Sequence, residues 1–165
     1  MTPSARQKRE AIELAWIALA YHEAALRLAE AGVSERFDRY RYLDLPALNL
    51  YHHCAELLYK AALNLVGVTP PRTHNLAELE DTCATHCPTL AFTVPKAFGN
   101  YKSGMDGLFG DFEREYFKSL GLRYRYPGQN LPDTIVMETD WPDLVAELTA
   151  FKLQTLKIWR DILLS

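Results

Sequence analysis

The chain has 165 residues, of which 18 are Lys or Arg and 21 are Asp or Glu, giving a net charge of −3. This length suits one domain with a buried core, and 48% hydrophobic and 12% aromatic residues exclude a disordered chain. The acidic balance excludes a broad basic surface for nucleic acid, so any such site must be local. We expect a single domain over residues 1–165.

The sequence carries no signature of export or membrane insertion. Charged residues, including Arg6, Lys8 and Glu10, precede an amphipathic stretch, which is unlike a secretory signal peptide. The three cysteines are an odd number, which argues against a disulfide framework. No apolar run approaches the roughly 18 residues of a membrane span. We expect a cytoplasmic protein that makes no membrane contact.

Hydrophobic spacing predicts a first helix over residues 4–31 that is apolar on two faces. One face carries Ile12, Trp16, Leu19 and Leu26, and the other carries Leu14, Ile17, Tyr21 and Leu28. A helix with so many large apolar side chains is central to a bundle or shared with a second subunit. We therefore expect a homodimer with Trp16 or Tyr21 near the contact.

A second helix is predicted over residues 44–66, with Asp44 as its cap and Pro46 in its first turn. Its apolar stripe consists of Ala47, Leu50, Tyr51, Cys54, Leu57, Leu58, Ala61 and Leu65. Its other side carries Asn49, His53, Glu56, Lys60 and Asn64. Two interpretations of this polar side stay open, a solvated helix face and the wall of a ligand groove.

Three further helices complete the pattern. A third is predicted to begin after a cap at Thr73 or Asn75 and to end at Pro88. A fourth is predicted over residues 95–120, on the spacing of Phe98, Tyr101, Met105, Leu108, Phe112, Tyr116 and Leu120. The last begins after a cap at Asp140 and buries Leu144, Leu148, Phe151, Leu156, Trp159 and Leu163. These elements predict an all-α, five-helix up-and-down bundle, with an ordered loop between the last two helices.

Three motifs recur in an order that resembles one known family. Glu56 and Lys60 stand in a Glu-x-x-x-Lys-Ala sequence, and His74-Asn75-Leu76 opens the third predicted helix. Arg123-Tyr124-Arg125-Tyr126-Pro127 is similar to an Arg-Tyr-Pro motif that follows the fourth helix in that family. The chain thereby resembles HEPN domains over about residues 10–160. The resemblance implies a five-helix bundle that binds a nucleotide, RNA or a partner nucleotidyltransferase.

Ribonuclease members of the HEPN family carry an Arg followed, after four to six residues, by a His. Arg steadies phosphate charge, and His can transfer a proton near neutral pH. This chain lacks that spacing, because only Thr73 separates Arg72 from His74. We therefore expect a non-catalytic module. The alternatives are a divergent ribonuclease toxin, which would use Arg72 and His74 and pair with an antitoxin protein, and a structural dimerisation domain.

Cationic and aromatic side chains define the predicted ligand site. The full set is His53, Glu56, Lys60, Asn64, Arg72, His74, Arg123, Tyr124, Arg125 and Tyr126. Arg72 and His74 precede a helix N-terminus, where backbone N–H groups favour an anion, and the Arg-Tyr run can stack bases and hold phosphates. The alternatives are a solvated Arg72 beside a packing His74, and a loop that covers the core.

Cys83, His86 and Cys87 share one predicted helix face, which raises the alternative of a zinc site. The chain has no Cys-x-x-Cys pair, and free cysteines are commonly small core residues. We therefore expect neither a metal nor a cofactor.

Overall fold

The computed structural model describes residues 2–34, 44–92 and 141–165. This part of the chain is all-helical and contains α1 (Ala5–Ser34), α2 (Asp44–Leu65), α3 (Leu76–His86), a single 3₁₀ turn η2 (Pro88–Leu90) and α6 (Trp141–Leu163). The predicted helix over residues 95–120, the loop over 121–140 and Asp140 itself lie outside the described residues. None of the helices described is long and apolar enough to cross a membrane.

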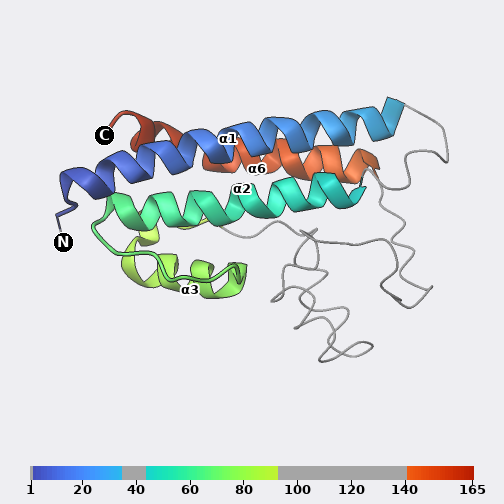
Figure 1. Cartoon of the computed structure of the whole chain (residues 1–165). Coiled ribbons are helices and arrows are strands. Elements are labelled where there is room, and N and C mark those ends of the chain that lie inside the picture. Colours follow the sequence, from blue (N-terminus) through green and yellow to red (C-terminus); the bar gives the residue numbers. More distant parts are fainter. Residues whose placement is uncertain (1, 35–43, 93–140) are drawn as a thin grey trace, which may run out of the picture.

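Three long helices form the body of the described part. Figure 1 shows α1, α2 and α6 side by side, with both α2 and α6 running opposite to α1. The short helix α3 lies against α2 on the side away from α1, after a turn that follows α2. The most extensive packing joins α1 to α2. The all-helical class is therefore confirmed for these residues.

The buried face of α1 differs from both predicted faces. It consists of Ala11, Ala15, Ala18, Ala25 and Ala29 together with His22, all with no exposed surface. Trp16 is 58% exposed and Ile17 48% exposed, so these two side chains are not part of the core between the helices. The expected homodimer contact near Trp16 stays a prediction. The pattern of large residues misled because alanine lets two helix backbones approach closely, which large side chains prevent.

The most buried helix is α2. Its apolar stripe is buried as predicted at Ala47, Tyr51, Cys54, Leu58 and Ala61. Its polar side is buried as well at His53, Glu56 and Asn64, so of the two open interpretations the solvated face does not hold at these three residues. With α1 on one side and α3 on another, α2 has little surface left for water.

A Schellman motif ends α2 at Gly67. The N–H of Gly67 donates to the carbonyl of Asn64 at 3.0 Å, and the N–H of Val68 donates to the carbonyl of Leu63 at 3.0 Å. Gly67 adopts a φ of 81°, which favours glycine. A Cβ atom at this position would also lie 3.2 Å from backbone atoms of Thr2 and Pro3. The turn after α2 and the N-terminal segment thus require a glycine.

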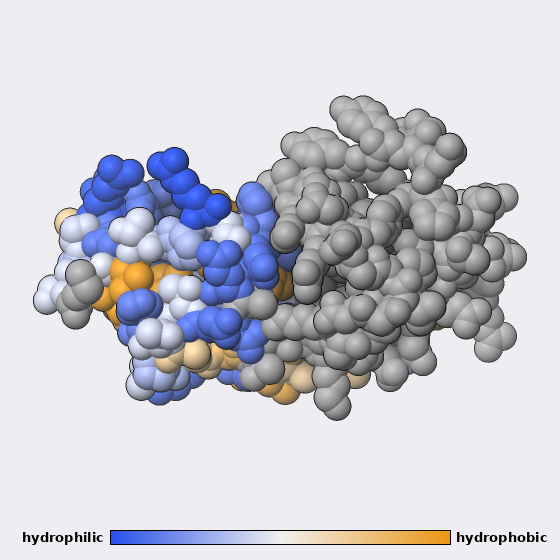
Figure 2. Space-filling model, turned by 90° about the horizontal axis from the view of Figure 1, so that it is seen from below, coloured by the Kyte–Doolittle hydropathy of each residue, from blue (hydrophilic) through white to orange (hydrophobic). Residues whose placement is uncertain are grey.

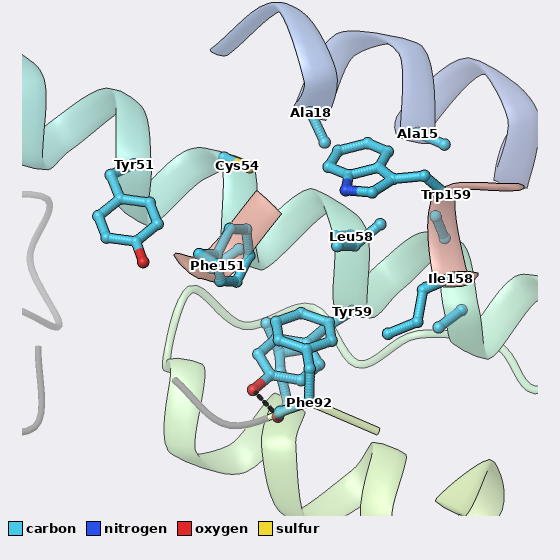
Figure 3. Packing of buried hydrophobic residues seen from close by; sticks show 14 of the residues in the cluster. Ala15, Ala18, Tyr51, Cys54, Leu58, Tyr59, Phe92, Phe151, Ile158 and Trp159 are labelled. Carbon is cyan, nitrogen blue, oxygen red and sulfur yellow. Dashed lines mark hydrogen bonds between the residues drawn. The ribbon is translucent and has the colours of Figure 1, made fainter. Parts of the chain in front are cut away.

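Aromatic rings from α2, from α6 and from Phe92, which follows η2, meet in the core (Figure 3). The ring of Tyr59 stacks on that of Phe92 with centroids 3.9 Å apart, and its hydroxyl donates to the Phe92 carbonyl at 2.7 Å. The Phe151 ring makes T-shaped contacts with the rings of Phe92 and Tyr51. In the same view the Trp159 indole lies beside Ala15 and Ala18 of α1.

The buried face of α6 confirms four of the six predicted positions, and Leu163 is partly buried. Leu144, Leu148, Phe151 and Trp159 are buried, but Leu156 is 49% exposed, so that prediction is wrong. Thr155 is buried beside it instead. Its hydroxyl donates to the Phe151 carbonyl at 2.7 Å and accepts from the Trp159 indole at 2.8 Å, so this polar residue has partners in the core.

Candidate functional site

A buried carboxylate on α2 lies at the centre of a group of polar side chains. Glu56 is 2% exposed. Its Oε1 accepts a hydrogen bond from Lys60 Nζ at 2.8 Å, and His74 Nδ1 lies 3.0 Å from Oε1 and 3.1 Å from Oε2. His53 Nδ1 lies 3.6 Å from Oε2. We call Glu56, Lys60, His53, His74 and His52 the Glu56 cluster.

Helix geometry and one turn bring the cluster together. His53 and Lys60 lie three residues before and four after Glu56, so all three share one face of α2. The chain then turns back through Pro70 and Pro71 and passes along α2 before α3 begins at Leu76. This return places the His74 ring against a residue that lies 18 positions earlier in the chain.

His52 holds the returning segment at its backbone. Its Nε2 lies 3.1 Å from the carbonyl oxygen of His74, and donates to it when the proton is on that nitrogen. Burial lowers the pKa of His52 to about 4, although the nearby Glu56 carboxylate opposes that shift. His52 is therefore neutral near pH 7 and acts as a fixed hydrogen-bond donor rather than a charge.

The Glu56 carboxylate stays ionised in this setting. Burial by itself raises the pKa of a carboxyl group, but the nearby His53 ring, the hydrogen bonds from Lys60 and His74 and the charge of Lys60 outweigh that effect. The pKa of Glu56 consequently lies below its usual range. The carboxylate therefore stays negatively charged, and the neighbouring side chains solvate it in place of water.

The cluster opens to solvent toward the start of α3. Side-chain exposure rises from 3% at Glu56 to 18% at Lys60 and 40% at His74, and Arg72 is exposed. Glu56 engages Nδ1 of His74, which leaves Nε2 as the ring nitrogen for any further partner. A carboxylate that holds an imidazole in this way fixes the orientation of the ring and leaves Nε2 for proton transfer or for an anion.

The predicted site residues divide into three groups. His53, Glu56, Lys60 and His74 come together, and Arg72 lies two residues from His74. Asn64 is buried one turn beyond Lys60, at the end of α2, where its backbone carbonyl accepts a hydrogen bond from the N–H of Gly67. The rest of the predicted set, Arg123, Tyr124, Arg125 and Tyr126, lies outside the described residues.

The prediction missed His52 as a member of this site. The His52–His53 pair was visible in the sequence, but His52 falls between the apolar stripe and the polar side of the helix, so neither pattern includes it. Tyr21 of α1 was also missed, because it was assigned to an apolar face. Its ring lies 5.6 Å from that of His53, which closes the cluster on the α1 side.

The cysteines belong to the core. Cys83 and Cys87 are buried, and the thiol of Cys83 donates to the Tyr59 carbonyl at 3.5 Å, whereas His86 is exposed. Within the described ranges, no group of three or more His, Cys, Asp or Glu side chains could hold a metal ion. Cys83, His86 and Cys87 therefore do not form a zinc site, because the imidazole points into water while both thiols are enclosed.

The chain was also compared with known proteins. No protein family, curated protein or solved structure matches it. The function must therefore be argued from the Glu56 cluster and from the surface of the helices.

Proposed function

We propose that this chain is a non-catalytic, HEPN-like helical module that binds a phosphate-bearing ligand, a nucleotide or an RNA, at the solvent edge of the Glu56 cluster. The observation that carries the proposal is the contact between the Glu56 carboxylate and Nδ1 of His74. It orients the imidazole of a residue that lies two positions after the exposed Arg72 in the chain. Both groups precede α3, whose first turn has backbone N–H groups without helical partners.

Charge within the cluster supports an anionic ligand. Glu56 is its one carboxylate, and the Lys60 ammonium at 2.8 Å balances that charge. The imidazole of His74 and the guanidinium of Arg72 remain as groups that favour an added negative charge. A phosphate is the common biological anion that takes several hydrogen bonds from such donors.

Binding and its position can be tested together. Titration of adenosine monophosphate and of a short RNA into the protein, followed by calorimetry, should show binding that Arg72→Gln weakens. Arg160→Gln is the matched control, because Arg160 is an exposed arginine on α6 and distant in sequence from the cluster. Equal loss in both variants, or no binding by wild type, would remove the proposal.

A ribonuclease is the second candidate, and the same His74–Glu56 contact favours it. An imidazole held through Nδ1 by a permanent carboxylate can accept a proton at Nε2 from a ribose hydroxyl, with Arg72 steadying the phosphate. Purified protein should then cleave a labelled RNA, and His74→Gln should abolish cleavage without loss of the fold. Under the binding proposal, wild-type protein leaves the RNA intact.

Exposed apolar residues support an additional protein contact. Trp16 and Ile17 of α1 and Leu153 of α6 are more than 45% exposed, at 58%, 48% and 66%. Such residues suit a second protomer, as in the proposed homodimer, or a partner such as a nucleotidyltransferase or an antitoxin. Light scattering of wild type and Trp16→Ser would test self-association. A monomer at every concentration would exclude the homodimer and the structural dimerisation domain.

A further inference from the structure

The two ring nitrogens of His74 differ in their surroundings. Nδ1 lies 3.0 Å and 3.1 Å from the two carboxylate oxygens of Glu56, so it carries a proton and donates to them. In the neutral ring Nε2 then has a lone pair and no proton. A lone pair repels a phosphate oxygen, whereas the protonated ring offers a second N–H and a positive charge.

We infer that the ligand of the Glu56 cluster is a terminal phosphate group, as in a nucleoside monophosphate, and that its binding is accompanied by uptake of a proton at Nε2 of His74. This inference rests on the proposed function. It adds the chemical class of the ligand and a dependence on pH that simple electrostatic attraction to Arg72 would not produce.

His74 is the group in the cluster that can take up this proton. The titratable or charged groups that face it or its immediate neighbours are Glu56, Lys60, His52 and His53 on α2, Tyr21 on α1 next to His53, Arg72 on its own segment and Glu78 on α3. Glu56 and Lys60 already form an ion pair. His52 contacts the His74 carbonyl and is mostly enclosed, so a charge on it would lack solvation.

Glu56 places a negative charge next to the His74 ring. The carboxylate touches Nδ1 directly, so a positive charge on the ring would lie beside an anion. The ring is 40% exposed, which lets both a proton and a ligand reach it. A dianionic phosphate bound at Nε2 would stabilise the same charge from the other side, which is why ligand binding and proton uptake favour each other.

The local charges favour a single phosphate over a nucleic-acid strand. Arg72 and protonated His74 together match the two charges of a terminal phosphate, whose second pKa is about 6. Beyond them, α3 carries Glu78, Glu80 and Asp81, which would repel the further phosphates of a chain laid along that helix. The net charge of −3 adds no attraction for a longer polyanion.

Calorimetry in buffers of different ionisation enthalpy tests the inference, with the full chain and adenosine monophosphate, inorganic phosphate or an RNA with hydroxyl ends as probes. We expect wild type to bind the first two, and to bind adenosine monophosphate with net proton uptake above about pH 7, where its phosphate is already dianionic, so that affinity rises by up to about tenfold as pH falls from about 8 to 7. His74→Gln should bind without proton uptake. His86→Gln, the matched control at the exposed end of α3, should behave as wild type.

Each contrary result overturns a different statement. Binding of adenosine monophosphate without proton uptake by wild type would overturn the proton-linked mechanism and leave the proposed function standing. Binding of the RNA alone would overturn the terminal phosphate as the ligand. No binding of any probe would overturn both. Should His74→Gln fail to fold, nitrogen NMR of histidine-labelled wild type decides, because ligand must convert the His74 ring to its doubly protonated form.

Discussion

Replacing Glu56 by Gln removes the charge at the centre of the cluster while keeping the shape of the side chain. Lys60 and His74 then lose the anion that their nitrogens contact at 2.8 Å and 3.0 Å. Breaking a fully buried pair costs about 3–5 kcal/mol. Because Lys60 and His74 retain 18% and 40% exposure, water can solvate part of their charge, and we expect a loss of about 2 kcal/mol in the free energy of unfolding.

Urea denaturation near pH 7, followed by circular dichroism, measures this loss for Glu56→Gln, Lys60→Met and the double variant. The two residues touch, so the double variant should lose at least about 1 kcal/mol less than the sum of the single losses. Glu10→Gln is the control: it breaks a Glu–cation pair at the same helical spacing, in which Arg6 is 87% exposed, and should have no measurable effect. A Glu56→Gln midpoint equal to that of wild type would refute the reasoning.

Three further measurements address the fold. Gly67→Ala should lower the unfolding free energy by at least about 1 kcal/mol in urea denaturation, since φ is 81° and a Cβ would crowd Thr2 and Pro3; an unchanged midpoint would contradict the Schellman assignment. Tyr59→Phe leaves the buried Phe92 carbonyl without its donor and should cost about 1–2 kcal/mol in the same assay. The pKa of His52 is about 4 in the folded protein and 6.5 in the unfolded chain, so as pH falls the unfolded chain binds this proton first. The contribution of neutral His52 to the free energy of unfolding is therefore fully present above about pH 6.5 and is lost as pH falls toward 4. That loss amounts to about 3 kcal/mol, and a pH series of urea denaturation should show His52→Gln to be less sensitive than wild type over this range.

The sequence predicted helix positions better than helix faces. The starts and ends of α2 and α3 follow from capping residues, Pro88 and Gly67, which act locally and can therefore be recognised in sequence. The buried face of α1 could not be found in the same way. Its alanines have little hydrophobic surface, and they are buried because α2 comes close, which is a property of two helices together.

The candidate site was predicted in composition but not in environment. The spacing of Glu56 and Lys60 indicated their ion pair, and His74 was named beside them. Their burial depends on the segment that returns after Pro70, and no pattern within α2 reveals that cover. The same return explains why His52, which contacts the His74 backbone, carried no recognisable signal.

The outer surface of the described helices carries mixed polarity. In Figure 2, hydrophilic residues cover much of the described part of the face seen from the α3 side, and hydrophobic patches lie between them. Among the exposed apolar side chains are Trp16 on α1 at 58% and Leu156 on α6 at 49%. Variants at these positions can report on partner contacts without disturbing the core.

The alanine face of α1 tolerates smaller side chains but not larger ones. Each of its five alanines already has no exposed surface, so a larger side chain there must push the helices apart, while the loss of one alanine methyl group from α1 leaves only a small gap. A deep mutational scan should accordingly find glycine and serine more acceptable than valine or leucine at Ala15 and Ala18. Growth of side-chain volume on α1 becomes acceptable only when a facing residue on α2 or α6 shrinks in the same molecule.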